Sequence, residues 1–143
     1  MSKVLAVDPG EVRIGIAISD ETGTLARPLT ILRHVSRSDD ARRIVELAQQ
    51  AEAGTIVVGL PLDAQGEVGP KARSALRLVE ALRAICQMPV IPWDESFSSQ
   101  KAAEIRIQAG VRRRTRAKPI DDLAAAVILQ DYLDRQQAGG ELA

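Results

Sequence analysis

The chain has 143 residues and a mass of 15.4 kDa, which fits one compact domain. Apolar residues make up 45% and charged residues 27%, so disorder, collagen and coiled coil are excluded as classes. The formal net charge is zero, and one histidine and one cysteine exclude a zinc site of nitrogen and sulfur ligands and a disulfide framework.

The N-terminal region predicts a meander of three strands. Residues 3–8 form an apolar strand that ends in Asp8, and turn residues follow directly. Residues 13–20 alternate isoleucine with small residues, which indicates a second strand paired with the first as a hairpin. Residues 28–33 predict a third strand that starts at Pro28, because proline begins a strand but does not fit its interior.

A helix is predicted next, with Ser38 as its N-cap and Gly54 as its end. Asp39 and Asp40 suit the positive N-terminal end of a helix. The apolar positions recur at helical spacing, at Ala41, Ile44, Val45, Ala48 and Ala51.

Two further strands flank a second helix. Residues 55–60 are a continuous apolar run, typical of a parallel strand that is buried on both faces. After a loop at 61–69, Pro70 opens the helix, whose apolar stripe is Ala72, Ala75, Leu76, Val79, Leu82, Ile85 and Cys86. Residues 89–93 predict a short fifth strand before Asp94 and Glu95. Cys86 is expected in the core, as is the ring of Trp93.

The C-terminal region predicts a helix from Ser98 or Ser99 to about Ala109, an arginine-rich loop, and a last helix over residues 120–136. This order of elements predicts an α/β fold, a mixed five-stranded sheet with helices on its faces. We expect a single domain over residues 1–137 and a flexible tail at 138–143.

Three carboxylates stand where this fold brings chain segments together. Asp8 ends the first strand, Glu95 follows the fifth, and Asp121 lies in the first turn of the last helix, where periodicity alone does not separate it from Asp122. Ligand sites in such sheets gather at the carboxyl ends of the strands. Converging carboxylates repel one another, and a hard divalent cation, Mg²⁺ or Mn²⁺, neutralises them. The sequence therefore predicts a metal site suited to phosphodiester hydrolysis.

The charges are unevenly distributed along the chain. Between residues 96 and 118, seven lysine and arginine residues stand against the single acidic residue Glu104. Such a basic segment beside an acidic site favours a nucleic-acid partner, because arginines bind phosphates without reading sequence. The predicted phosphate contacts are Arg13, Arg112, Arg113, Arg114 and Arg116.

Four motifs in order resemble the YqgF family, also called RuvX. They are Val-Asp-Pro-Gly at 7–10 with Arg-Ile-Gly at 13–15, Val-Gly-Leu-Pro at 58–61 with Gly66, Trp-Asp-Glu at 93–95, and Ile-Asp at 120–121 before an alanine-rich helix. The resemblance runs from about Lys3 to Tyr132. The resemblance implies a ribonuclease H-like fold. The family consists of bacterial proteins that are assigned as nucleases maturing the 5′ end of pre-16S ribosomal RNA, or as Holliday-junction resolvase homologues.

Carried over by position, the resemblance implies that Asp8, Glu95 and Asp121 are the catalytic metal ligands. One departure concerns the third motif, where the family usually has arginine after Asp-Glu and this chain has Ser96. We therefore predict a metal-dependent nuclease, cytoplasmic and without a membrane segment, that acts on pre-rRNA or branched DNA as a monomer or weak homodimer.

Three other functions remain open at this stage. A junction resolvase would cut two symmetric strands and so act as a two-fold dimer. A relative of sugar kinases would use a similar strand and turn to bind nucleotide phosphates. A non-catalytic RNA-binding or transcription-associated factor would keep the acidic cluster only as a stabilising element, an option that Ser96 leaves open. His34 is expected at a strand end or on the surface.

Overall fold

The sheet of this protein has five strands in the order β3-β2-β1-β4-β5. The computed structural model describes residues 3–95 and 121–142, with side chains described for 3–95 and 123–137. The strands are β1 (Lys3–Asp8), β2 (Arg13–Ser19), β3 (Ala26–Arg33), β4 (Ala53–Leu60) and β5 (Val90–Asp94). β1, β2 and β3 pair antiparallel, whereas β1, β4 and β5 pair parallel. The mixed sheet predicted from the sequence is thus confirmed.

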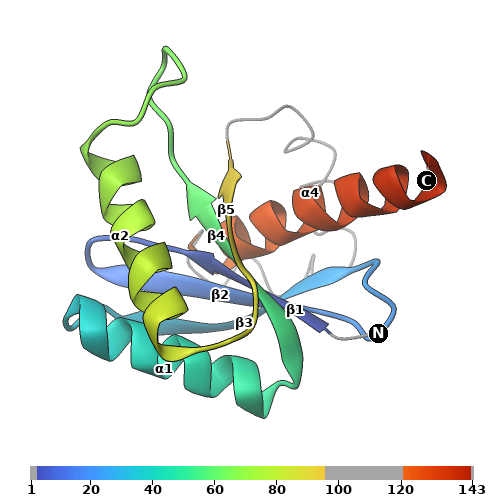
Figure 1. Ribbon diagram of the computed structural model, residues 1–143, viewed down its shortest axis with the longest axis horizontal. Coiled ribbons are helices and arrows are strands. Elements are labelled where there is room, and N and C mark those ends of the chain that lie inside the picture. Colours follow the sequence, from blue (N-terminus) through green and yellow to red (C-terminus); the bar gives the residue numbers. More distant parts are fainter. Residues whose placement is uncertain (1–2, 96–120, 143) are drawn as a thin grey trace.

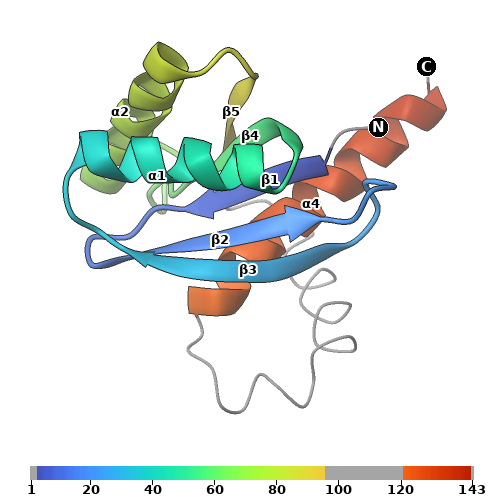
Figure 2. The ribbon, with the colours of Figure 1, turned by 90° about the horizontal axis from the view of Figure 1, so that it is seen from below.

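Helices cover both faces of the sheet, as predicted. α1 (Arg37–Gln50) and α2 (Pro70–Ile85) lie on one face, and α4 (Asp121–Leu142) crosses the other (Figures 1 and 2). The helix predicted at 98–109 and the arginine-rich loop lie outside the described residues. No helix in the described part of the chain combines the length and apolar character that crossing a bilayer requires.

Successive side chains of the central strands point to opposite faces of the sheet, so the interior is divided into two cores. Leu5 and Val7 of β1 pack with α1 and α2, while Ala6 packs with residues of α4. In β4, Ile56 and Val58 face the first core, and Val57 faces the second. Side chains that alternate between two covered faces explain why the sequence of β4 is continuously apolar.

The prediction for both ends of α1 was wrong. Ser36, not Ser38, is the N-cap, and its Oγ accepts a hydrogen bond from the N–H of Asp39 at 3.2 Å. The helix ends at Gln50 with Ala51 as its C-cap, before Glu52 adopts a positive φ of 60°. Gly54 does not end the helix and instead belongs to β4. A glutamate therefore takes the left-handed conformation that sequence reasoning assigns to a glycine.

Pro28 lies inside β3, contrary to the prediction that it begins the strand. β3 is an edge strand with β2 as its neighbour, so a residue without an N–H is tolerated there. Pro28 pairs with Ala17 beside a register shift, at which Leu29 of β3 has no partner in β2.

Two helices differ in detail from the predicted patterns. In α2, Leu78 joins the buried stripe, whereas Ile85 at the helix end is 52% exposed. α4 continues to Leu142, past the predicted end at residue 136 and through two glycines. Glycine disfavours a helix interior, which is why the sequence pattern placed the end earlier.

Candidate active site

Asp8 lies at the carboxyl end of β1, directly before a tight turn. A Cβ added at Gly10 would lie 2.2 Å from the carbonyl oxygen of Arg13, a distance that no side chain tolerates. The chain therefore folds back at Gly10 in a way that only glycine permits, and it enters β2 at Arg13. This turn holds the carboxylate at the end of a rigid strand.

Glu95 follows β5, and its backbone N–H donates to the carbonyl of Leu60 at 3.3 Å. A Cβ added at Gly59 would lie 2.8 Å from Oε2 of Glu95 and 2.6 Å from Cδ1 of Ile128. The Glu95 carboxylate therefore extends over the backbone of β4, the strand between β5 and β1. Gly59 leaves the space that this approach to Asp8 needs.

The two carboxylates belong to the face of the sheet that α4 covers. Asp8 shares the strand alternation of Ala6, which packs against α4, and Gly59 faces Ile128 of α4. Gln137, near the other end of α4, donates to the carbonyl of Gly23 at the opposite edge of the sheet. α4 therefore begins on the side of the sheet where β1 ends (Figure 2).

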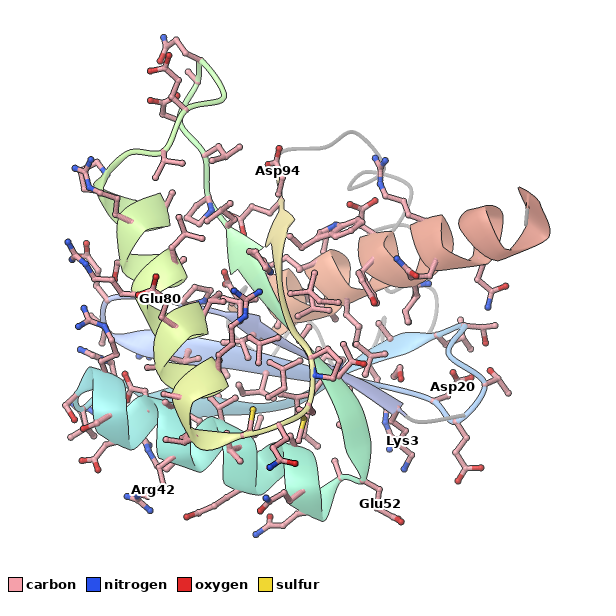
Figure 3. All side chains as sticks on the ribbon, in the orientation of Figure 1. Lys3, Asp20, Arg42, Glu52, Glu80 and Asp94 are labelled. Atoms are coloured by element: carbon pink, nitrogen blue, oxygen red, sulfur yellow. The ribbon has the colours of Figure 1, made fainter. Side chains whose placement is uncertain are left out.

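The electrostatics of Glu95 reflect this crowding. Burial raises the pKa of Glu95 to about 7, and repulsion from Asp8 and Asp94 adds to the effect. Figure 3 shows Asp94 at the carboxyl end of β5, with Lys3 at the start of β1 far from it. A carboxylate under such repulsion favours a proton or a cation beside it.

A cavity of about 800 Å³ opens at this edge of the sheet. Asp8 and Glu95 line it together with three basic residues, Arg13, His34 and Lys71. The loop at 61–69 projects beyond the same edge (Figure 1). The prediction brought Asp8, Glu95 and Arg13 to one place, and the structure brings them to one cavity. Sequence reasoning did not predict that Lys71 and His34 line this cavity, because neither residue belongs to a motif.

The remaining predicted site residues are not placed by the structure. The side chain of Asp121, the first residue of α4, is not described, and the loop that contains Arg112, Arg113, Arg114 and Arg116 lies outside the described residues. Within the described part of the chain, no three His, Cys, Asp or Glu side chains form a group able to hold a metal ion.

Trp93 and Cys86 occupy packing positions, in accord with the prediction for both. Trp93 packs against the core beneath α4, and its ring meets Tyr132 edge to face at a centroid distance of 5.1 Å. Cys86 is the C-cap of α2 and packs, half-buried, against the other core.

Comparison with known proteins places the chain in a family. The model of the family described as "RuvX: Holliday junction resolvase" matches residues 2–135. The chain belongs to the RuvX family. Two similar RuvX relatives, from Thermoanaerobacter pseudethanolicus and Roseiflexus sp., are both named "Putative pre-16S rRNA nuclease". The first is 39% identical over 136 residues, covering 94% of this chain and 98% of the relative. The second is 40% identical over 135 residues, covering 94% and 96%.

Solved structures with the same architecture include two resolvases. Thermus thermophilus RuvC in complex with a Holliday junction superposes with a TM-score of 0.66 at 15% identity, covering 96% of this chain and 97% of that one. The fowlpox virus resolvase with junction DNA gives 0.56 at 14% identity, covering 94% and 98%. At these identities the likeness establishes the ribonuclease H-like fold. Membership of the RuvX family, with relatives named as nucleases, confirms the predicted enzyme class, a nuclease that hydrolyses phosphodiester bonds.

Proposed function

We propose that this RuvX family member is a divalent-cation-dependent nuclease that processes structured RNA, namely the 5′ end of pre-16S ribosomal RNA. The ligands would be Asp8, Glu95 and Asp121. The observation that carries the proposal is the meeting of Asp8 and Glu95, from β1 and β5, in one cavity with basic residues on its wall. The names of the RuvX relatives support the substrate.

The described donor atoms fit Mg²⁺ or Mn²⁺. Both ions prefer carboxylate oxygens, and the described part of the cavity offers these without a cysteine. The pKa of Glu95 is raised by burial and further by repulsion from Asp8, and a cation between the two carboxylates relieves that repulsion. Asp121 would complete the set from the start of α4.

Each residue of the cavity has a distinct task in this proposal. Asp8 and Glu95 hold their oxygens at fixed strand ends, with Gly59 leaving room for the second. Arg13, in the cavity wall, would contact a phosphate and offset its charge. When bound, the cation would activate water and stabilise the negative charge that develops on the phosphodiester during attack.

A second candidate function is Holliday-junction resolution. The description of the RuvX family favours it, and the fold is that of two resolvases. Paired incision of a four-way junction requires two active sites related by a two-fold axis. A RuvX protein that stays monomeric on junction DNA would therefore not be a resolvase of this kind.

The experiment compares cleavage of precursor 16S rRNA and of a four-way DNA junction, each in Mg²⁺ and in Mn²⁺. Asp8→Asn and Glu95→Gln are expected to lower the rate at least about 100-fold, because both would lose a ligand charge. Glu80→Gln is the matched control, since Glu80 is exposed on α2 and lies outside the cavity (Figure 3).

The outcomes separate the candidate functions. Cleavage of the RNA by the parent and the control, but not by the two variants, supports the proposal. Preferential cleavage of the junction by a dimer supports the resolvase. Stabilisation of the parent by Mn²⁺ without cleavage of either substrate would indicate that the acidic site binds metal but is not catalytic.

A further inference from the structure

His34 is held by a buried carboxylate at the border of the candidate active site. Its Nδ1 is hydrogen-bonded to Oδ2 of Asp40, whose side chain is only 4% exposed. The His34 side chain itself is 41% exposed and lines the cavity that contains Asp8 and Glu95. With Nδ1 engaged by Asp40, Nε2 is the ring nitrogen that remains for a ligand in the cavity.

Asp40 is itself firmly held, so it fixes the orientation of the imidazole. Its Oδ1 accepts from the N–H of Val35 at 3.0 Å and from Nη2 of Arg43 at 2.8 Å. Burial raises the pKa of Asp40, but the hydrogen bonds from Val35, His34 and Arg43 outweigh burial and hold it below its usual value. Nη2 of Arg43 also donates to the carbonyl of Arg33 at 2.6 Å, which ties α1 to the end of β3.

The strand register places His34 beside the basic wall of the cavity. Arg33, the last residue of β3, pairs with Arg13, the first residue of β2. The backbone N–H of His34 then donates to the carbonyl of Val12 at 2.9 Å. β3 lies two strands from β1 in the sheet, so the backbone of β3 runs about 10 Å from that of β1.

We propose that His34 binds a backbone phosphate of the nucleic acid, next to the phosphate that is cleaved. In this arrangement both ring nitrogens donate, Nδ1 to Asp40 and Nε2 to a phosphate oxygen. Arg13 and Lys71 line the same cavity and supply the positive field that a second phosphate needs. The inference rests on the proposed function, because the phosphate bound by His34 would belong to the nucleic-acid strand that is cleaved in the active site.

A phosphate fits these surroundings better than a base does. Trp93 and Tyr132 pack together in the core, and the aromatic residues of the chain number one Trp, one Tyr and one Phe. A ring oriented by a buried carboxylate presents a single polar nitrogen in a fixed direction, which suits a charged oxygen. The contact is therefore expected to be the same for RNA and DNA strands of any sequence.

The test measures binding without cleavage. Labelled RNA and DNA strands of identical sequence are titrated with the full-length protein in EDTA, at several salt concentrations between about 50 and 200 mM. His34→Asn keeps a donor near Asp40 but lacks the reach of Nε2. Arg77→Gln is the control, because Arg77 is exposed on α2 and lies outside the cavity wall. Thermal melting verifies that each variant is folded.

His34→Asn is expected to weaken binding of both strands about five- to tenfold. The slope of log Kd against log salt concentration should fall by about 0.7 to 0.9, as for the loss of one phosphate contact. Arg77→Gln should change Kd less than about twofold. Unchanged affinity and slope in His34→Asn would overturn the inference, and so would a loss confined to RNA, which would indicate a contact to the ribose hydroxyl.

The same measurements separate this inference from the proposed function. Binding in EDTA is measured without a divalent cation and without cleavage, so it does not require the nuclease activity. If the parent cleaves neither substrate but binds both strands in a His34-dependent way, the proposed nuclease activity fails and the phosphate contact stands. If Asp8→Asn abolishes cleavage while His34→Asn binds like the parent, the reverse holds.

Discussion

The indole Nε1–H of Trp93 donates to Oδ2 of Asp131 at 2.8 Å, and this bond joins β5, which leads into Glu95, to α4, which begins at Asp121. Trp93 lies in β5, two residues before Glu95, and Asp131 lies in α4, which begins at Asp121. Oδ1 of the buried Asp131 accepts from Nε of Arg135 at 3.1 Å. The bond therefore fixes the position of α4 relative to the end of β5.

Trp93→Phe keeps an aromatic ring against Tyr132 but removes the donor to Asp131. We expect the free energy of unfolding to fall by about 2 kcal/mol, because a buried carboxylate oxygen loses its partner. The affinity for Mn²⁺ should also fall, because the variant lacks the bond that fixes the start of α4 relative to Glu95. Chemical denaturation and calorimetric titration with Mn²⁺ measure the two effects. A variant that loses stability but binds Mn²⁺ like the parent would show that the bond does not position the site.

Gly59→Ala tests the space through which Glu95 approaches Asp8. The added methyl would lie 2.6 Å from Cδ1 of Ile128 and 2.8 Å from Oε2 of Glu95, so both side chains must move. We expect a loss of about 1–3 kcal/mol in the free energy of unfolding and a loss of nuclease activity.

The double variant Gly59→Ala with Ile128→Val is the control for this prediction. Removing Cδ1 of Ile128 relieves the contact with α4 but leaves the contact with Glu95. Stability should therefore recover in part, while activity stays low. Full recovery of activity in the double variant would contradict a role of Gly59 in placing Glu95.

The raised pKa of Glu95 predicts a specific dependence of stability on pH. Its usual value is 4.5 and its value in the folded protein is about 7, so the folded state binds the proton more tightly. The stabilising contribution is complete below about pH 4.5 and is lost as the pH rises through 7. The loss is at most about 3 kcal/mol, at roughly 1.4 kcal/mol for each pKa unit, and solvent screening of the partly exposed side chain lowers it.

Glu95→Gln removes this contribution. Denaturation curves between about pH 4.5 and 8 should show a free energy of unfolding that declines more steeply for the parent than for the variant. Mn²⁺ should stabilise the parent more at pH 8 than at pH 5, because the cation competes with the proton for Glu95. Parallel pH profiles for parent and variant would contradict the raised pKa.

Much of this fold could be predicted because its signals are local. The apolar run of β4 and the alternation of β2 indicate strands directly, and the parallel strands of such a sheet end at one edge. That rule alone predicts that Asp8 and Glu95 lie close together, although they are far apart in the chain.

The features that sequence reasoning missed depend on contacts between distant elements. Gly59 is needed because of Ile128 and Glu95, and nothing in its own neighbourhood shows this. Asp40 looks like an ordinary first-turn carboxylate of α1. Its burial, and its bond to His34, follow from how α1 packs against the end of β3, which periodicity does not specify.

Asp40→Asn tests whether this buried carboxylate stabilises the fold through its charge. The substitution keeps the shape of the side chain but leaves Arg43 without its anionic partner, so we expect a loss of about 2 kcal/mol at neutral pH. Because the pKa of Asp40 is lowered from 3.8, its contribution is present above about pH 4 and is lost as the pH falls further. Parent and variant should therefore converge in stability toward acid pH.

The variant Asp39→Asn, at an exposed neighbour, serves as the control. Asp39 pairs with Arg42 at the surface, so this substitution should change the free energy of unfolding by less than about 0.5 kcal/mol. If Asp40→Asn is no less stable than Asp39→Asn at neutral pH, the charge of Asp40 does not support the end of β3.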